Sequence, residues 1–197
     1  MSIADKALLL KKDFDDVYEA GRKSFMEDYQ QGGARRNYNV GFGGIGWNDD
    51  TYNPLYDIIC VGNVGTMYGN ASITNTKVTI DWTNASNTGY AFSGCTKIVT
   101  IPLIIFGRSN IYYSHTFSDL TNLENFTAGG VISSNGFNMS ASKKLTVPSL
   151  LSILYTLEDK STDTSGTSWV CTLGTENLAK LTDAEKAIAT QKGWSLA

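Results

Sequence analysis

The spacing of apolar residues in the first part of the chain predicts an amphipathic helix. Between residues 1 and 31 these residues recur at alternating intervals of four and three, at Ile3, Ala7, Leu10, Phe14 and Val17. This is the a/d spacing of a heptad repeat. It predicts either a short coiled coil between identical chains, with a trimer favoured, or a single amphipathic helix that packs on its own domain or docks on another protein. The five residues are therefore the candidates for oligomerisation or docking.

From residue 58 to residue 147 a longer pattern takes over. Large apolar residues stand at Tyr68, Phe92, Phe117 and Met139, with intervals of 24, 25 and 22 residues. A short apolar stretch follows each of them and predicts one strand per repeat. A period of this length predicts a solenoid, in which stacked repeats share one buried column. Further residues expected in that column are Ile98, Leu123 and Leu145.

Residues 32–57 are rich in glycine and aromatic residues. Gly41, Gly43 and Gly46 have the spacing of a dinucleotide-binding loop. Such a loop needs a strand before it and a helix that opens at the third glycine. The turn-forming stretch Trp47–Pro54 follows instead. The segment therefore predicts a tight loop that serves as a linker or an N-terminal cap, with no cofactor.

Residues 148–197 predict a small α/β cap for the far end of the repeats. A strand is expected at Leu145–Val147, followed by a helix at Pro148–Leu157 with proline in its first turn. A further strand is expected at Trp169–Leu173, and Trp194–Leu196 is expected to form a closing strand or a tail.

A second helix is expected between these last two segments. Thr182 and Glu185 have the spacing of a capping box, which begins a helix, and Gly193 is placed to end it.

The repeat resembles the BspA-like, or treponema-type, leucine-rich repeat. Tyr90–Pro102 (YAFSGCTKIVTIP) is close to the pattern of that family, and Thr116–Phe126 (TFSDLTNLENF) keeps its phenylalanine and leucine. The copies at Met139 and Tyr68 depart further from it. The block at 36–57 and the C-terminal stretch Leu173–Trp194 are similar to the segments that flank such repeats in proteins of Firmicutes phages and prophages.

The resemblance implies an α+β fold: a β-rich leucine-rich-repeat solenoid with an N-terminal helix and a C-terminal α/β cap. The expected divisions are a helix at 1–31, a linker or N-terminal cap at 32–57, the solenoid at 58–147 and the C-terminal cap at 148–197.

The resemblance also implies a non-enzymatic virion protein with a structural or adhesive role, on the tail, a fibre or the capsid surface. The expected partners are other virion proteins and a protein or glycan of the host surface. Two alternatives remain open: a BspA-like adhesin of a bacterial cell surface and a polysaccharide-degrading enzyme.

Composition and charge argue against nucleic-acid binding, membrane insertion, disulfides and a metal site. The formal net charge is -3 and the isoelectric point is near 5.1, so no basic surface for nucleic acid is expected. No apolar run approaches the length of a membrane span, and the first ten residues do not have the pattern of a signal peptide. Cys60, Cys95 and Cys171 are far apart, which favours neither disulfides nor a metal site.

Few residues are suited to catalysis. His115 is the only histidine, and Ser114 and Asp119 are close to it in sequence. A catalytic triad assembles in space, so this proximity alone favours a polar repeat position over an active site. Trp82, Tyr112 and Tyr113 have no obvious place in the repeat core, and exposed aromatic residues often bind sugars or proteins. We therefore predict these three as surface-binding residues and predict no catalytic, cofactor or metal site.

Overall fold

The computed structural model describes residue 50, residues 58–107 and residues 111–197. The predicted helix at 1–31, with Ile3, Ala7, Leu10, Phe14 and Val17, lies outside the described residues. The same holds for the 32–57 segment, apart from Asp50, whose carboxylate accepts hydrogen bonds from the backbone and side chain of Thr74 at 3.0 and 2.7 Å.

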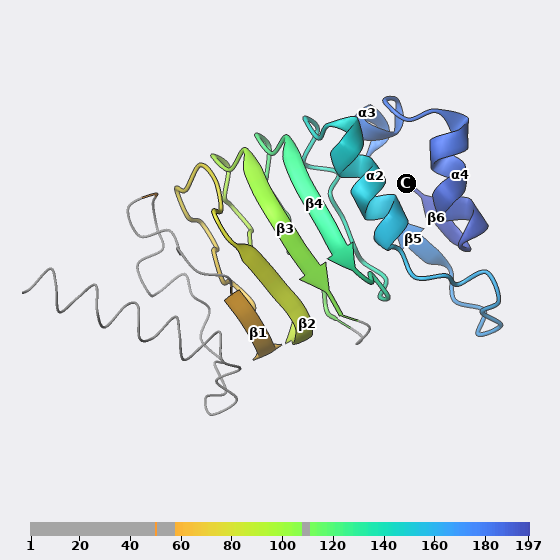
Figure 1. Cartoon of the computed structure of the whole chain (residues 1–197), viewed down its shortest axis with the longest axis horizontal. Helices are drawn as coiled ribbons and strands as arrows, with labels where there is room; N and C mark the ends of the chain where they lie inside the picture. Colours follow the sequence, from red (N-terminus) through yellow and green to blue (C-terminus); the bar gives the residue numbers. More distant parts are fainter. Residues whose placement is uncertain (1–49, 51–57, 108–110) are drawn as a thin grey trace, which may run out of the picture.

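Four parallel strands form a sheet in the order β1-β2-β3-β4, as Figure 1 shows. The strands are β1 (Ile58–Asn63), β2 (Thr79–Asn87), β3 (Thr100–Phe106) and β4 (Asn125–Gly130). Each residue pairs with one 22 to 25 positions later, for example Ile58 with Ile80 and Thr100 with Asn125. We call the successive segments unit 1 (58–78), unit 2 (79–99), unit 3 (100–124) and unit 4 (125–146).

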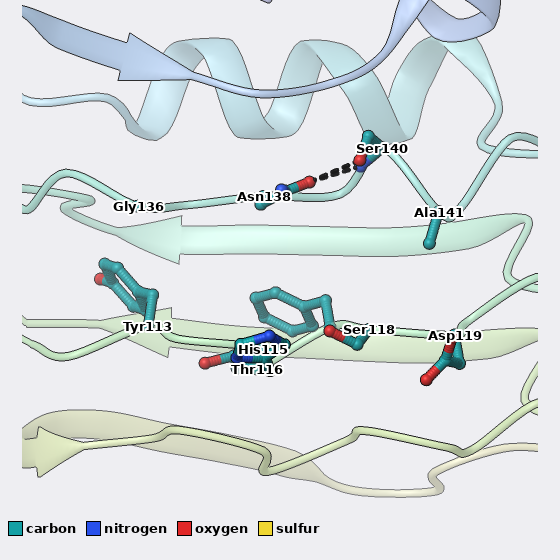
Figure 2. A pocket seen from close by; sticks show the side chains of 10 residues that line it. Tyr113, His115, Thr116, Ser118, Asp119, Gly136, Asn138, Ser140 and Ala141 are labelled. Atoms are coloured by element: carbon teal, nitrogen blue, oxygen red, sulfur yellow. Dashed lines mark hydrogen bonds between the residues drawn. The ribbon is translucent and has the colours of Figure 1, made fainter.

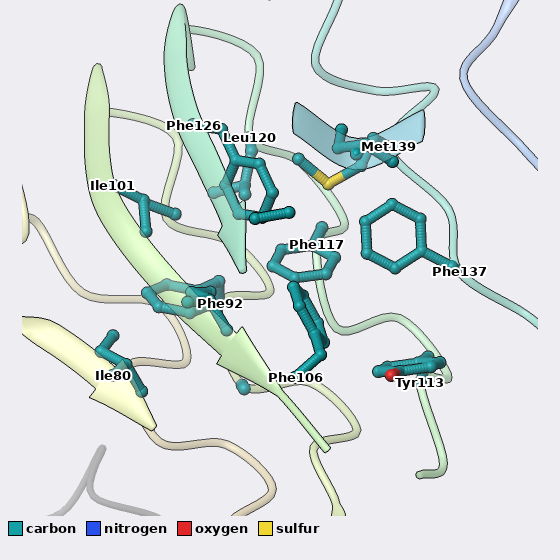
Figure 3. Packing of buried hydrophobic residues seen from close by; sticks show 14 of the residues in the cluster. Ile80, Phe92, Ile101, Phe106, Tyr113, Phe117, Leu120, Phe126, Phe137 and Met139 are labelled. Atoms are coloured by element: carbon teal, nitrogen blue, oxygen red, sulfur yellow. The ribbon is translucent and has the colours of Figure 1, made fainter. Parts of the chain in front are cut away.

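The buried column follows the predicted repeat. The rings of Tyr68 and Phe92 stack with centroids 5.0 Å apart, and those of Phe92 and Phe117 with centroids 6.1 Å apart. Met139 takes the corresponding position in unit 4, because its carbonyl accepts a hydrogen bond from Ser142 as that of Phe92 does from Cys95. Figure 3 shows part of this core. Burial of each such side chain contributes about 1.5–3 kcal/mol to folding.

Helix α2 (Val147–Thr156) lies beside β4, where a fifth strand would otherwise pair (Figure 1). The backbone N–H groups of Phe126 and Ala128 donate to the hydroxyls of Ser149 and Ser152, at 2.9 and 3.1 Å. These hydroxyls, with that of Thr156, donate in turn to carbonyls of the same stretch at 3.2–3.3 Å. One face of the helix thus forms the hydrogen bonds that a neighbouring strand would form.

The prediction of a strand at Leu145–Val147 is wrong. Thr146 is the N-cap of α2, and Pro148 in the first turn fixes helical backbone geometry immediately afterwards. The predicted helix at Pro148–Leu157 is confirmed to within one residue at each end.

The remaining elements are β5 (Trp169–Cys171), α3 (Thr175–Leu178), α4 (Asp183–Gln191) and β6 (Trp194–Leu196). The strands β5 and β6 pair in parallel; β5 was expected from the sequence, and β6 was expected as a strand or a tail. The capping box is confirmed: the Glu185 N–H donates to the Thr182 hydroxyl at 3.3 Å, and the Thr182 N–H donates to the Glu185 carboxylate at 2.8 Å.

Two lysines attach this C-terminal region to the units before it. The Lys192 ammonium donates to the carbonyls of Tyr155 and Leu157, at 2.6 and 2.7 Å, and so covers the last carbonyls of α2. The Lys180 ammonium donates to the Leu145 carbonyl at 2.8 Å. The described chain is therefore a mixed α and β structure, with a parallel sheet followed by a small helical region.

Candidate functional site

Units 1, 2 and 3 each contain a six-residue turn across the core from the sheet, at 65–70, 89–94 and 114–119. We call the three stacked turns the turn row. The turns share a backbone shape in which two positions have positive φ. The first position holds Thr66, Tyr90 and His115, with φ between 54° and 60°, and the second holds Asn70, Gly94 and Asp119, with φ between 61° and 76°.

This common shape allows the turns to bond to one another. The N–H groups of Tyr90, Phe92 and Gly94 donate to unit 3 carbonyls at 2.9–3.2 Å. The corresponding groups of Thr66, Tyr68 and Asn70 donate to unit 2 carbonyls at 2.6–3.0 Å. The turn row is therefore a rigid, hydrogen-bonded surface.

The local sequence explains how each turn begins. The side chains of Asn63 and Asn87 accept hydrogen bonds from the N–H two residues later, at 3.0 and 2.8 Å, which starts the turn. In unit 3 the corresponding residue is Tyr112. Its ring lies over Gly89, where an added Cβ would approach it to 3.3 Å. Tyr112 remains 59% exposed.

Unit 4 departs from this pattern. The interval from Phe117 to Met139 is 22 residues, against 24 and 25 for the earlier intervals, and unit 4 has no six-residue turn. The N–H groups of His115, Phe117 and Asp119 correspond to those that donate in units 1 and 2. Within the described residues, none of the three has a hydrogen-bond partner.

A cleft of about 290 Å³ lies where the missing turn would stand. Figure 2 shows His115, Ser118 and Asp119 on one wall and Asn138 and Ser140 on the other. Tyr113 lies at one end. Its hydroxyl is buried and has no hydrogen-bond partner among the described residues. Burial raises the pKa of this phenol, which keeps the hydroxyl protonated to a higher pH than in an exposed tyrosine.

His115 is held in a defined orientation. Its ring stacks on that of Tyr90, with centroids 4.8 Å apart and an interplanar angle of 4°. Its Nδ1 lies 2.7 Å from the Ser114 hydroxyl. Because Tyr90 covers the face of the ring toward unit 2, the opposite face is the one directed at the cleft.

The described residues of the cleft match neither of two common hydrolytic arrangements. A serine–histidine pair needs a third group that orients the imidazole, and no described residue bonds to Nε2 of His115. A glycosidase needs two facing carboxylates, and Asp119 is the one acidic residue among the described residues that line the cleft. Within the described residues there is also no group of three or more potential metal ligands.

The structure corrects two of the three predicted surface-binding residues. Trp82 and Tyr113 are 0% and 3% exposed, so the prediction that they lie at the surface is wrong. Trp82 points inward from β2, where it alternates with Ile80 and packs against Phe106 with ring centroids 5.6 Å apart. Tyr113 alternates with the buried Ile111 and packs against Phe137. Tyr112 is exposed, and its role in binding stays a prediction.

Sequence reasoning missed Tyr90 and Asn138 as candidate residues, and it considered Asp119 as a catalytic residue but not as part of a binding site. The sequence does contain one signal for the cleft, the shortened interval between Phe117 and Met139. A unit that lacks some residues leaves part of the preceding unit without a stacked neighbour. The residues predicted for oligomerisation or docking in segment 1–31 lie outside the described residues, and their role stays a prediction.

Comparison of the chain with protein-family models, with curated proteins and with solved structures gave no match. Among the residues that the structure describes, no helix combines the length and the apolar character required to cross a membrane.

Proposed function

We propose that this chain is a non-enzymatic phage virion protein with a structural and adhesive role, on the tail, a fibre or the capsid surface. In this proposal units 1–4 are coils of a BspA-like leucine-rich-repeat solenoid. The helix at 1–31 docks the chain on the particle or trimerises it, and residues 148–197 close the far end.

The observation that carries a binding role is a set of three exposed aromatic side chains: Tyr90 and His115 on the turn row, and Tyr112, whose ring lies over Gly89 of the same row. Tyr90 and Tyr112 are 46% and 59% exposed, and the ring of His115 stacks on that of Tyr90. Rings of this kind offer a large contact area with few rotatable bonds, so little entropy is lost when they bind. The hydrogen-bonded backbone beneath them lowers that cost further.

The same side chains would serve an adhesin on a bacterial cell surface, and location distinguishes the two proposals. Particles released by the strain that encodes the chain would be purified on a density gradient and probed with antibody against the chain. We expect the chain to co-purify with particles and to be labelled on the tail or the capsid. Recovery in the cell envelope, with none in particles, would support the adhesin instead.

The non-enzymatic part of the proposal has its own test. Purified chain would be incubated with host cell wall and with capsular polysaccharide, and new reducing ends would be measured. We expect none above a buffer control. Release of sugar that is lost in a His115→Ala variant would establish the enzyme alternative.

A further inference from the structure

We propose that the cleft between turn 114–119 and residues 136–141 binds a neutral, hydroxyl-rich ligand the size of a single sugar unit. This deepens the proposed adhesive function and rests on it for its biological setting.

The first step is the interrupted ladder of hydrogen bonds. The N–H groups of Tyr90, Phe92 and Gly94 are each bonded to the next unit, whereas those of His115, Phe117 and Asp119 have no partner among the described residues. Unit 2 shows that N–H groups at these positions point toward the following unit. In unit 3 that direction leads into the cleft. A ligand that accepts hydrogen bonds would complete the row.

The other polar groups of the cleft set the charge of the ligand. Asn138 Oδ1 is engaged by the N–H and hydroxyl of Ser140, at 2.9 and 2.7 Å, so its amide nitrogen is left as a further donor. The Asp119 carboxylate has no hydrogen-bond partner within the described chain and is an acceptor. An anionic ligand would be repelled by this carboxylate. A sugar both accepts and donates through its hydroxyls and so matches donors and carboxylate together.

The aromatic groups add a second kind of contact. One face of the His115 ring is covered by Tyr90 at 4.8 Å, which leaves the other face toward the cleft. Aromatic faces of this kind are suited to the C–H groups of a sugar ring.

Size and backbone shape argue against an extended peptide. The cleft volume of about 290 Å³ lies near the lower end of the range for ligand sites, roughly 300–1,000 Å³. In addition, His115 and Asp119 have φ of 54° and 66°, so their N–H groups do not follow the geometry of a strand edge.

The test is a titration of the full chain, labelled with ¹⁵N, with D-glucose, D-galactose, N-acetyl-D-glucosamine and L-rhamnose. We expect at least one sugar to shift the amide resonances of His115, Phe117 and Asp119 together, with Kd of about 1 mM, as for a small ligand. Inorganic phosphate and a short peptide of glycine and serine serve as the competing probes.

Asp119→Gly separates binding from folding. Glycine occupies the corresponding position in unit 2, where Gly94 has φ of 76°, so the variant should fold with an unchanged or slightly higher unfolding midpoint. We expect its sugar affinity to fall at least tenfold. Asn70→Gly is the matched control, because it makes the same change at the corresponding position of unit 1 (φ 61°), away from the cleft, and should bind like the parent chain.

Three results would overturn the inference: no shift of these amides with any sugar, equal shifts with phosphate or the peptide, or loss of binding in Asn70→Gly as well as in Asp119→Gly. The proposed function fails separately. A chain that is present in particles but binds no sugar refutes only this inference, whereas a chain that binds sugar but is absent from particles refutes only the virion assignment.

Discussion

At the scale of single residues, the turn row places ordinary side chains where the backbone favours glycine. Thr66, Tyr90 and His115 all have positive φ, at a cost of about 1–2 kcal/mol each. The hydrogen bonds between turns and the stacking of Tyr90 on His115 offset that cost. The positive φ angles were not predicted from the sequence, because glycine is the usual signal for them. Of the six positions with positive φ in the turn row, only Gly94 is glycine.

Burial raises the pKa of two cysteine thiols. It raises the pKa of Cys95 from 9.0 to about 11 and that of Cys171 to about 12. Cys95 donates a hydrogen bond to the Tyr68 carbonyl, which fixes the protonated thiol in place. Both thiols are therefore neutral in the folded chain at pH values where the unfolded chain has begun to ionise them.

We expect the stability of the protein to fall above about pH 9. A group whose folded pKa is raised contributes full stability below its unfolded pKa and loses it as pH rises toward the folded value. At pH 10.5 the loss should be on the order of 1–2 kcal/mol for each thiol. Urea unfolding between pH 7 and pH 10.5 measures it.

The control for this prediction is Cys171→Ala. The variant should be less stable at every pH, because it leaves a cavity, but its stability should change less between pH 8 and pH 10.5. A parent chain with constant stability up to pH 10.5 would contradict the prediction.

At the scale of elements, side chains of α2 form the hydrogen bonds that the open edge of β4 would otherwise lack. Ser149, Ser152 and Thr156 lie on one face of the helix and bond to the backbone of β4. An open edge strand is a template for pairing with other chains, so this helix protects the sheet as well as the core.

We expect Ser149→Ala to destabilise the protein by about 1–3 kcal/mol, because the buried N–H of Phe126 would lose its partner. Alanine is the better helix former, so helix propensity alone predicts the opposite sign. Thr190→Ala, at an exposed position of α4, is the control and should change stability by less than about 0.6 kcal/mol. Equal urea midpoints for Ser149→Ala and the parent chain would disprove the role of the hydroxyl.

Most elements could be predicted from sequence because their signals are local. The capping box at Thr182 and Glu185 and the proline at 148 fix helix starts within a few residues. The sequence predicted the helix α2, but not that it takes the place of a fifth strand beside β4. Leu145–Val147 has the composition of a strand, and the contact between α2 and β4 is visible only in the structure. Trp82 was predictable, since Val78, Ile80 and Trp82 alternate as inward strand positions do.

At the scale of the whole molecule, three successive units of the described chain share a six-residue turn, and the fourth has none. The anchors Tyr68, Phe92, Phe117 and Met139 were predicted correctly as buried, equivalent positions. The cleft was not predicted, because it depends on what unit 4 lacks and not on residues that attract notice by themselves. Units 1–3 therefore form the hydrogen-bonded turn row, and the missing turn in unit 4 leaves the cleft that is the candidate site.

The heptad stripe at 1–31 yields a prediction about assembly. We expect the full chain to be a trimer in solution. Replacement of Leu10 and Phe14 by aspartate should make it monomeric, because charges at a and d positions cannot be buried without partners. Light scattering measures the mass. The control replaces Lys12 and Asp16, which lie outside the stripe, by alanine. A parent chain that is monomeric would indicate that the helix packs on its own domain or docks onto another protein.

The position of α2 after β4 also matters during synthesis. Gly130, at the end of β4, leaves the ribosome before Thr156, at the end of the helix, with a delay of roughly 1–5 s at 5–20 residues per second. If the four strands pair as they leave the ribosome, the edge of β4 is uncovered during that interval. Translation speed through this stretch thus sets how long neighbouring nascent chains on one messenger can pair with each other.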